Sequence, residues 1–255
     1  MPFKPVQSEK ISLAVVRQIE LLILRGILRP GDKLPAERDL AETMAVSRPS
    51  LRVALGDLQD RGLLESRQGA GVFVADVLGS AFSDALIDLF ARHPEAVQDT
   101  VAFRRDIEAL AAERATRLAS DTDLKVIDAI FQKMLAAHER RDADHEAQLD
   151  SQFHLAIVEA GHNIIMLHMM RSMYELLRGG VFYNRQVIFR QRTRRQALLD
   201  QHAKINTAIQ SRDPLAARAA IEAHLDFVEQ ALNDQRRAQA NEEIAQARLD
   251  YETRR

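Results

Sequence analysis

The sequence predicts a mainly α-helical protein with two domains: a small N-terminal unit of three helices and a β-hairpin, and a larger all-helical bundle. Two observations lead to this prediction. Short amphipathic segments in the first 75 residues end in two strand-like runs around a glycine-rich tip. From about residue 80 onward, apolar residues recur at helical spacing and no further strand-like alternation appears.

The N-terminal unit is predicted to begin with a helix over residues 12–25. Its apolar side chains recur every three or four residues, and Gly26 is suited to end it. Pro30 and Gly31 then predict a tight turn. Pro35 is expected in the first turn of a second, short helix, because proline is favoured at that position.

A third helix is expected after a turn at residues 44–46, with Ser47 as its N-cap, and it continues to about Gly62. The runs 63–67 and 72–74 then predict a hairpin. Three helices, the last two joined by a short turn and followed by a hairpin, are the elements of a winged helix-turn-helix. We therefore expect residues 1–78 to form a DNA-binding domain.

Several polar residues of this domain are placed to contact DNA. The third helix of such a domain enters the major groove, and residues at its N-terminus reach the base edges. Arg48 and Arg52 project from the same helix face, where an arginine can donate two hydrogen bonds to guanine. The competing interpretation is that these arginines are ordinary solvated side chains. Arg38 is placed to hold a phosphate or to share in the base contacts. The remaining expected contacts, to phosphates and the minor groove, are from Ser47, Ser50 and Gly69.

Residues 79–236 are expected to form an all-α bundle of seven helices. The dipeptides His93-Pro94 and Asp213-Pro214 mark breaks between helices. The expected helices span about 81–92, 98–118, 122–140, 144–160, 163–179, 181–211 and 214–236. Residues 237–255 form a charged C-terminal tail, which predicts either a solvated extension of the last helix or a disordered segment.

The composition excludes several classes of protein. The chain has no cysteine, so disulfide frameworks, thiolate catalysis and cysteine-ligated metals are excluded. No apolar stretch is long enough to cross a membrane and the N-terminus lacks an export signal, so we expect a cytoplasmic protein with no membrane partner. The net charge of the whole chain is −2, but residues 1–75 carry 11 Lys and Arg against 9 Asp and Glu, so this part alone is slightly basic.

Four residues of the helical part form a candidate metal site. Asp150 and His154 are four residues apart and lie on one helix face, while His202 and His224 lie on two later helices. A bundle can bring such side chains together, and one carboxylate with three imidazoles suits a divalent metal, zinc first, with nickel, manganese and iron as alternatives. The competing interpretation is a helix-surface pair. Four other histidines of this part are expected in surface or packing roles: His138, His145, His162 and His168.

Residues 12–75 closely resemble the N-terminal domain of the GntR transcription regulators. The matching segments are Leu28–Arg38, Val46–Arg52 and Gly62–Val74. The resemblance implies that Arg38, Arg48, Arg52 and Gly69 contact DNA, and that the protein is a homodimer on a palindromic operator. Relatives often have Glu-Ala after the second arginine, and Val53-Ala54 at this position bears only on operator preference.

Residues 81–235 resemble the FCD sensor domain of the FadR subfamily. Its metal-binding members carry Asp-x-x-x-His and two later histidines, which implies that Asp150, His154, His202 and His224 are the ligands. Arg104 matches an arginine of the family, whose guanidinium could pair with an effector carboxylate; a salt bridge to a nearby acid is the alternative.

The effector expected from this resemblance is a small carboxylate. Four segments are most similar to those of pyruvate- and lactate-responsive regulators: Phe82–Asp84, His93–Glu95, Glu159–Asn163 and Leu167–His168. This resemblance implies a two- or three-carbon hydroxy or keto acid, with citrate or an amino-acid-derived acid as the alternative. Tyr183, Asn184 and Arg185 lie at a polar start of a long predicted helix and are expected to contact a hydroxyl or keto group of the effector.

The sequence therefore predicts a DNA-binding transcriptional regulator, a repressor by default, whose operator affinity responds to a carboxylate such as lactate or pyruvate. Activation is the alternative sign of regulation. A second alternative is a regulator whose metal is purely structural or is itself the signal. A metal-dependent enzyme is disfavoured, because the sequence has neither a zincin-type glutamate near the ligands nor a nucleophile motif.

Overall fold

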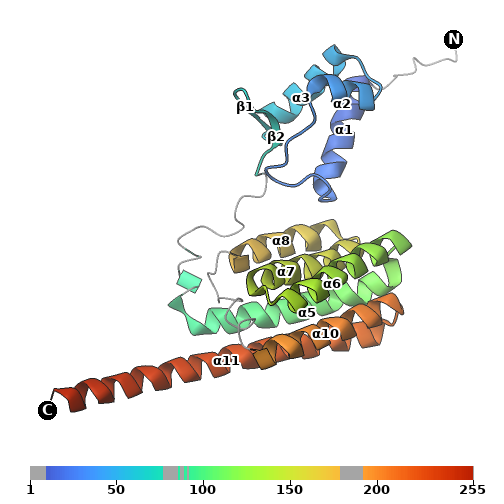
Figure 1. Cartoon of the computed structure of the whole chain (residues 1–255). Coiled ribbons are helices and arrows are strands. Elements are labelled where there is room, and N and C mark those ends of the chain that lie inside the picture. Colours follow the sequence, from blue (N-terminus) through green and yellow to red (C-terminus); the bar gives the residue numbers. More distant parts are fainter. Residues whose placement is uncertain (1–9, 77–85, 87–88, 91, 179–191, 255) are drawn as a thin grey trace, which may run out of the picture. The chain divides into compact units, whose positions relative to one another are not determined.

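The computed structural model describes residues 10–76, 86, 89–90, 92–178 and 192–254. It divides the chain into two compact units, Met1–Gly79 and Ser80–Arg255, whose elements are labelled in Figure 1. Of the helix expected over 81–92, residues 86, 89–90 and 92 are described, and they are helical. Tyr183, Asn184 and Arg185 lie outside the described residues.

The first unit is a winged helix-turn-helix, as predicted. Strands β1 and β2 are antiparallel, with Leu64 opposite Val74 and Arg67 opposite Gly71. The elements are α1 (Ile11–Leu24), α2 (Glu37–Thr43), α3 (Arg48–Asp60), β1 (Leu64–Arg67) and β2 (Gly71–Val74). We call the hairpin 64–74 the wing. The core of the unit is made by apolar side chains from all three helices and both strands, among them Val16, Ile19, Leu51, Leu58, Leu64 and Val74.

Local signals explain the start of α3 and the end of α1. Oγ of Ser47 accepts a hydrogen bond from the backbone N–H of Ser50 at 3.2 Å, so Ser47 caps α3 as predicted. Gly26 has φ of 70°, the left-handed conformation that ends α1.

The prediction that Pro35 lies in the first turn of α2 is wrong. This helix begins at Glu37, with Ala36 at its N-cap. The preceding residue, Leu34, is buried in the core, and its N–H donates to the carbonyl oxygen of Val72 in the wing at 2.9 Å. This tertiary contact holds the segment against the wing and delays the start of the helix.

The second unit is an all-α bundle, as predicted, and Figure 1 shows its helices packed side by side. Proline begins two of them, since Pro94 and Pro214 each stand at a helix start. The helices are α5 (Pro94–Leu118), α6 (Asp121–Arg140), α7 (Ala143–Ala160), α8 (Ile164–Arg178), α10 (Arg192–Gln210) and α11 (Pro214–Thr253). Of the two alternatives for residues 237–255, the structure has the helical extension, which continues to Thr253.

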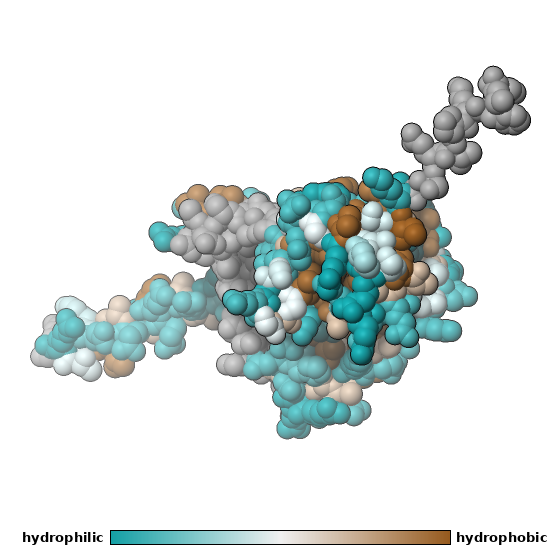
Figure 2. Space-filling view, turned by 90° about the horizontal axis from the view of Figure 1, so that it is seen from above, coloured by the Kyte–Doolittle hydropathy of each residue, from teal (hydrophilic) through white to brown (hydrophobic). Residues whose placement is uncertain are grey.

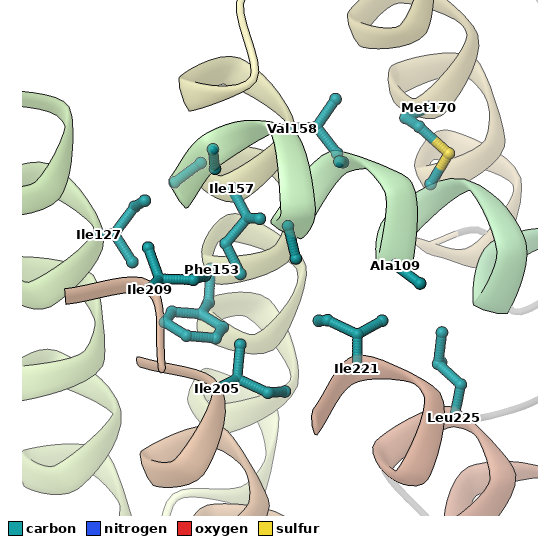
Figure 3. Close-up of a cluster of buried hydrophobic side chains, with 14 of the residues drawn as sticks. Ala109, Ile127, Phe153, Ile157, Val158, Met170, Ile205, Ile209, Ile221 and Leu225 are labelled. Carbon is teal, nitrogen blue, oxygen red and sulfur yellow. The ribbon is translucent and has the colours of Figure 1, made fainter. Parts of the chain in front are cut away.

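The bundle core lies among helices α5, α6, α7, α8, α10 and α11. Figure 3 shows Phe153 and Ile157 of α7 facing Ile205 and Ile209 of α10, and all four side chains are at most 1% exposed. Because the side chains interlock in this close packing, each helix is held in one position against its neighbours. A site built from several helices requires such fixed positions. Among the described residues, no helix is both long and apolar enough to span a bilayer.

Candidate metal centre and DNA-binding surface

The structure presents the predicted arginines on the outside of the first unit. Arg48 is the first residue of α3 and is exposed. The side chain of Arg52, one turn further, is 62% exposed and donates from Nε to Glu37 of α2 at 2.7 Å. Arg38 of α2 is 80% exposed and pairs with Asp39. The first turn of α2 and the first two turns of α3 therefore lie together and carry three exposed guanidinium groups.

The serines and the wing glycine have defined local roles. The hydroxyl groups of Ser47 and Ser50 are 2.8 Å apart, so they form one polar pair at the N-terminus of α3. Gly69 lies at the tip of the wing with φ of 71°, a conformation that side chains other than glycine rarely adopt. No heavy atom lies within 4 Å of the place where a Cβ would stand, so the tip is open.

The four predicted metal ligands converge inside the second unit. Asp150 and His154 come from α7, His202 from α10 and His224 from α11, and each is at most 5% exposed. One ligand atom from each residue lies within 4.8 Å of the others. Nε2 of His202 is 3.0 Å from Oδ1 of Asp150 and 3.3 Å from Nε2 of His154.

Other side chains orient two of the imidazoles. Nδ1 of His154 lies 2.7 Å from Oε2 of Glu108, and Nδ1 of His224 lies 3.0 Å from Oε1 of Gln201. The contact between His154 and Glu108 is an ion-pair distance without hydrogen-bond geometry. The Gln201 oxygen is an acceptor, which favours a proton on Nδ1 of His224 and leaves the lone pair on its Nε2. A ligating histidine in proteins is held in the same way, by an acceptor at its outer nitrogen. The donor set, one carboxylate and three imidazoles, therefore fits a divalent cation.

Burial keeps this cluster in the charge state that a metal requires. Removal from water lowers the pKa of His202 below its ordinary value, although Asp150 partly offsets this effect. The pKa of His224 is lowered much further by burial and by the neighbouring His202 and His154. Because only a neutral imidazole can donate a lone pair, these shifts favour coordination at neutral pH.

Arg104, the predicted effector residue, is buried and already paired. It is 1% exposed, and its Nε donates to Oε1 of Glu108 at 2.7 Å. The hydroxyl of Tyr174 donates to the same oxygen at 2.8 Å. Burial raises the pKa of Glu108, but Arg104 and His154 outweigh it and hold that pKa well below its usual range. The salt bridge weighed as the alternative is thus formed, and it links Arg104 to a metal-ligand candidate.

A buried ion pair joins α7 to α10, the helices that carry three of the four ligands. Nε of Arg195 donates to both carboxylate oxygens of Glu146, at 2.7 and 2.8 Å. Glu146 precedes Asp150 by one turn and Arg195 precedes His202 by two, so the pair lies on the same helix faces as the cluster. It fixes how α10 lies against α7.

We expect Arg195→Met to lower the free energy of unfolding by about 3–5 kcal/mol, because the buried carboxylate of Glu146 loses its partner. Urea denaturation monitored by circular dichroism measures this. Arg105→Met is the matched control, since Arg105 also joins two helices but its pair with Asp226 is 37% and 55% exposed. Equal losses in the two variants would contradict the role of the buried pair.

Sequence reasoning found the four clustered residues and missed those that support them. Glu108 is one helical turn from Arg104, a spacing that could have indicated an ion pair. Gln201 and Tyr174 carry no comparable signal, because their partners are distant in the sequence.

The fold and its comparisons define the class of the protein. A winged helix-turn-helix joined to a helical bundle with a buried Asp/His cluster is the architecture of a transcriptional regulator with a DNA-binding and a sensing part. The chain belongs to the GntR family: residues 11–74 match the family "Bacterial regulatory proteins, gntR family", and residues 99–227 match the FCD domain. It is therefore a DNA-binding regulator of transcription and not an enzyme.

Two relatives from Escherichia coli K12 are similar over most of their length. The "Glc operon transcriptional activator" is 34% identical over 231 residues, 89% of this chain and 91% of the relative. The "Putative L-lactate dehydrogenase operon regulatory protein" is 37% identical over 227 residues, 88% of this chain and 86% of the relative. The solved structure of Streptococcus agalactiae GntR, at 24% identity, covers 86% of this chain and 100% of its own with a TM-score of 0.52, which supports the fold.

Proposed function

We propose that the chain is a homodimeric repressor that releases its operator when a small carboxylate, such as lactate or pyruvate, binds beside a divalent metal in the second unit. The observation that carries this proposal is the convergence of Asp150, His154, His202 and His224 at one buried point. Zn²⁺ is the first candidate for the metal, with Ni²⁺, Mn²⁺ and Fe²⁺ as alternatives.

The metal would supply a buried positive charge with coordination positions open to a carboxylate. The chain's own residues would do the rest. Arg104 would exchange part of its pairing with Glu108 for the effector carboxylate, because one guanidinium can serve two acceptors. We further propose Tyr183 and Asn184 as contacts to a hydroxyl or keto group. The L-lactate dehydrogenase operon regulator among the relatives supports an effector of this size.

The domain of residues 1–78 would bind DNA, and the domain of residues 79–236 would bind the metal and the effector. Residues 237–255 would form a charged tail. Arg48 and Arg52 would read base edges. Arg38, Ser47 and Ser50 would hold the phosphates, and Gly69 would let the wing approach the minor groove. A homodimer would match the inverted repeat of a palindromic operator. Binding to chromosomal DNA implies that the protein acts in the cytoplasm.

The metal and the effector are tested separately on chelator-treated protein. We expect one equivalent of Zn²⁺ to bind and to raise the melting temperature, since saturation at about 100 times Kd adds about 2.7 kcal/mol of stability. L-lactate and pyruvate are then titrated into the metal-loaded protein while binding to an operator duplex is followed by fluorescence anisotropy. A coupling of about 1–3 kcal/mol would weaken operator binding about 5–150-fold.

Each outcome of this titration distinguishes the alternatives. A change of operator affinity caused by Zn²⁺ alone would indicate a metal sensor. Stabilisation by Zn²⁺ with no response to any carboxylate would indicate a structural metal. Tighter operator binding with lactate would indicate an activator, as the name of the Glc operon relative states for that protein. No binding of any divalent metal would overturn the proposed centre.

A further inference from the structure

Helix α11 continues well beyond the core of the bundle. Its first half is anchored by buried residues, of which Ala231 and Leu232 are the last. All residues from 237 to 254 are exposed, although the helix runs to Thr253. Figure 1 shows this segment extending past the other helices of the unit, and in Figure 2 it is mainly hydrophilic with isolated apolar side chains.

Four of the apolar residues of this extension lie in one row along the helix, while Ala238, Ala245 and Leu249 lie outside it. Ala240, Ile244, Ala247 and Tyr251 follow one another at steps of four, three and four residues, which is the spacing of a coiled-coil seam. Ile244 is 52% exposed and Tyr251 is 65% exposed. We call these four residues the seam. The exposed side chains of the seam present hydrophobic surface to water, and a partner helix would cover it.

The charges beside the seam indicate what that partner is. With Ile244 and Tyr251 at the a positions of a heptad, Glu243 occupies a g position and Arg248 the following e position. In a parallel pair of identical helices, g of one faces this e of the other, so Glu243 would meet Arg248 of the second copy twice, by symmetry. In an antiparallel pair g faces g, and Glu243 and Asp250 are both acidic.

We propose that residues 240–251 form a parallel two-stranded coiled coil with the same segment of a second copy of this chain. Two heptads alone are too short to be stable in water, because helix nucleation is costly. In this chain the helix is already formed by its packing in the bundle, through Ile221, Leu225 and Val228. The seam shares no residue with the metal cluster or with the wing, so the proposal can fail without affecting the proposed function, and the reverse also holds.

Disulfide cross-linking tests the seam directly, since the chain has no cysteine of its own. Ala247→Cys places a thiol in the seam. Ala245→Cys places one two residues away on the same helix, also exposed but facing elsewhere. We expect mild oxidation to link Ala247→Cys into covalent dimers at least about tenfold faster than Ala245→Cys, because d positions of a parallel pair face each other. Equal cross-linking rates in the two variants would overturn the proposal. The absence of a covalent dimer in Ala247→Cys would overturn it too, and this is the result that an antiparallel pair would give.

A second set of variants separates the seam from any other contact between copies. Ile244→Asp places a charge in the seam, and Leu249→Asp places one about 140° round the helix at a side chain of similar exposure, 56%. In the Ala247→Cys background, Ile244→Asp should slow cross-linking more than about tenfold, since the charge would be buried without a partner, and Leu249→Asp should not. Glu243→Arg should slow it too, and adding Arg248→Glu should restore it. Retention of the link in Ile244→Asp would refute the seam.

Discussion

Arg48→Ala is expected to abolish specific operator binding while the protein stays folded. A bidentate arginine–guanine contact contributes about 1–3 kcal/mol of discrimination, and a two-fold symmetric complex makes it twice, so the loss is about 2–6 kcal/mol. Binding to an unrelated duplex should change much less, because it depends on charge and not on base edges. Fluorescence anisotropy with both duplexes at one salt concentration measures the ratio.

Arg61→Ala is the control for this prediction. Arg61 follows the last residue of the same helix, and its guanidinium pairs with Glu20 and Asp57 of the first unit. Thirteen residues of helix place it about 20 Å from Arg48. We expect its removal to leave specificity intact. A specific-to-unrelated binding ratio that is the same in Arg48→Ala as in the unchanged protein would show that α3 does not enter the groove by its N-terminus.

His202→Ala is expected to remove the metal and the response to the carboxylate together, with operator binding preserved. The imidazole is fully buried between Asp150 and His154, so its loss leaves three ligand groups around a cavity. Outer-shell changes alone weaken metal binding about 10–100-fold, and loss of a ligand should exceed this. Metal content after gel filtration and calorimetric titration with Zn²⁺ check the prediction.

His145→Ala, at an exposed position near the start of α7, is the control and should bind metal normally. His202→Gln, which fills more of the cavity, distinguishes a lost ligand from a disturbed core. A full metal equivalent in both His202 variants would remove this residue from the proposed centre.

Much of the fold follows from local signals in the sequence. The cap residue Ser47 marks the start of α3, Gly26 marks the end of α1, and the glycines of the wing mark the hairpin turn. All of these signals are visible in the sequence. Pro35 shows where such reasoning fails, because the burial of Leu34 decides where α2 begins. The start of α5 was placed at residue 98 and lies at Pro94, since helix boundaries are weakly encoded.

The candidate site is predictable in part, for a physical reason. Asp150 and His154 share a helix face, and this periodicity is visible in the sequence. That His202 and His224 reach the same point depends on how α10 and α11 pack, which the resemblance to the FCD domain supplied. Glu108 and Gln201 orient their imidazoles through contacts between helices, and no spacing along the chain indicates them.

The length of α11 has a mechanical consequence. His224 lies in the buried part of this 40-residue helix, and about 44 Å of continuous helix separate it from Thr253. A straight rod amplifies small rotations, so a tilt of about 5° around His224 would displace the far end by about 4 Å. Any adjustment of that imidazole would therefore be largest outside the bundle, where the chain ends.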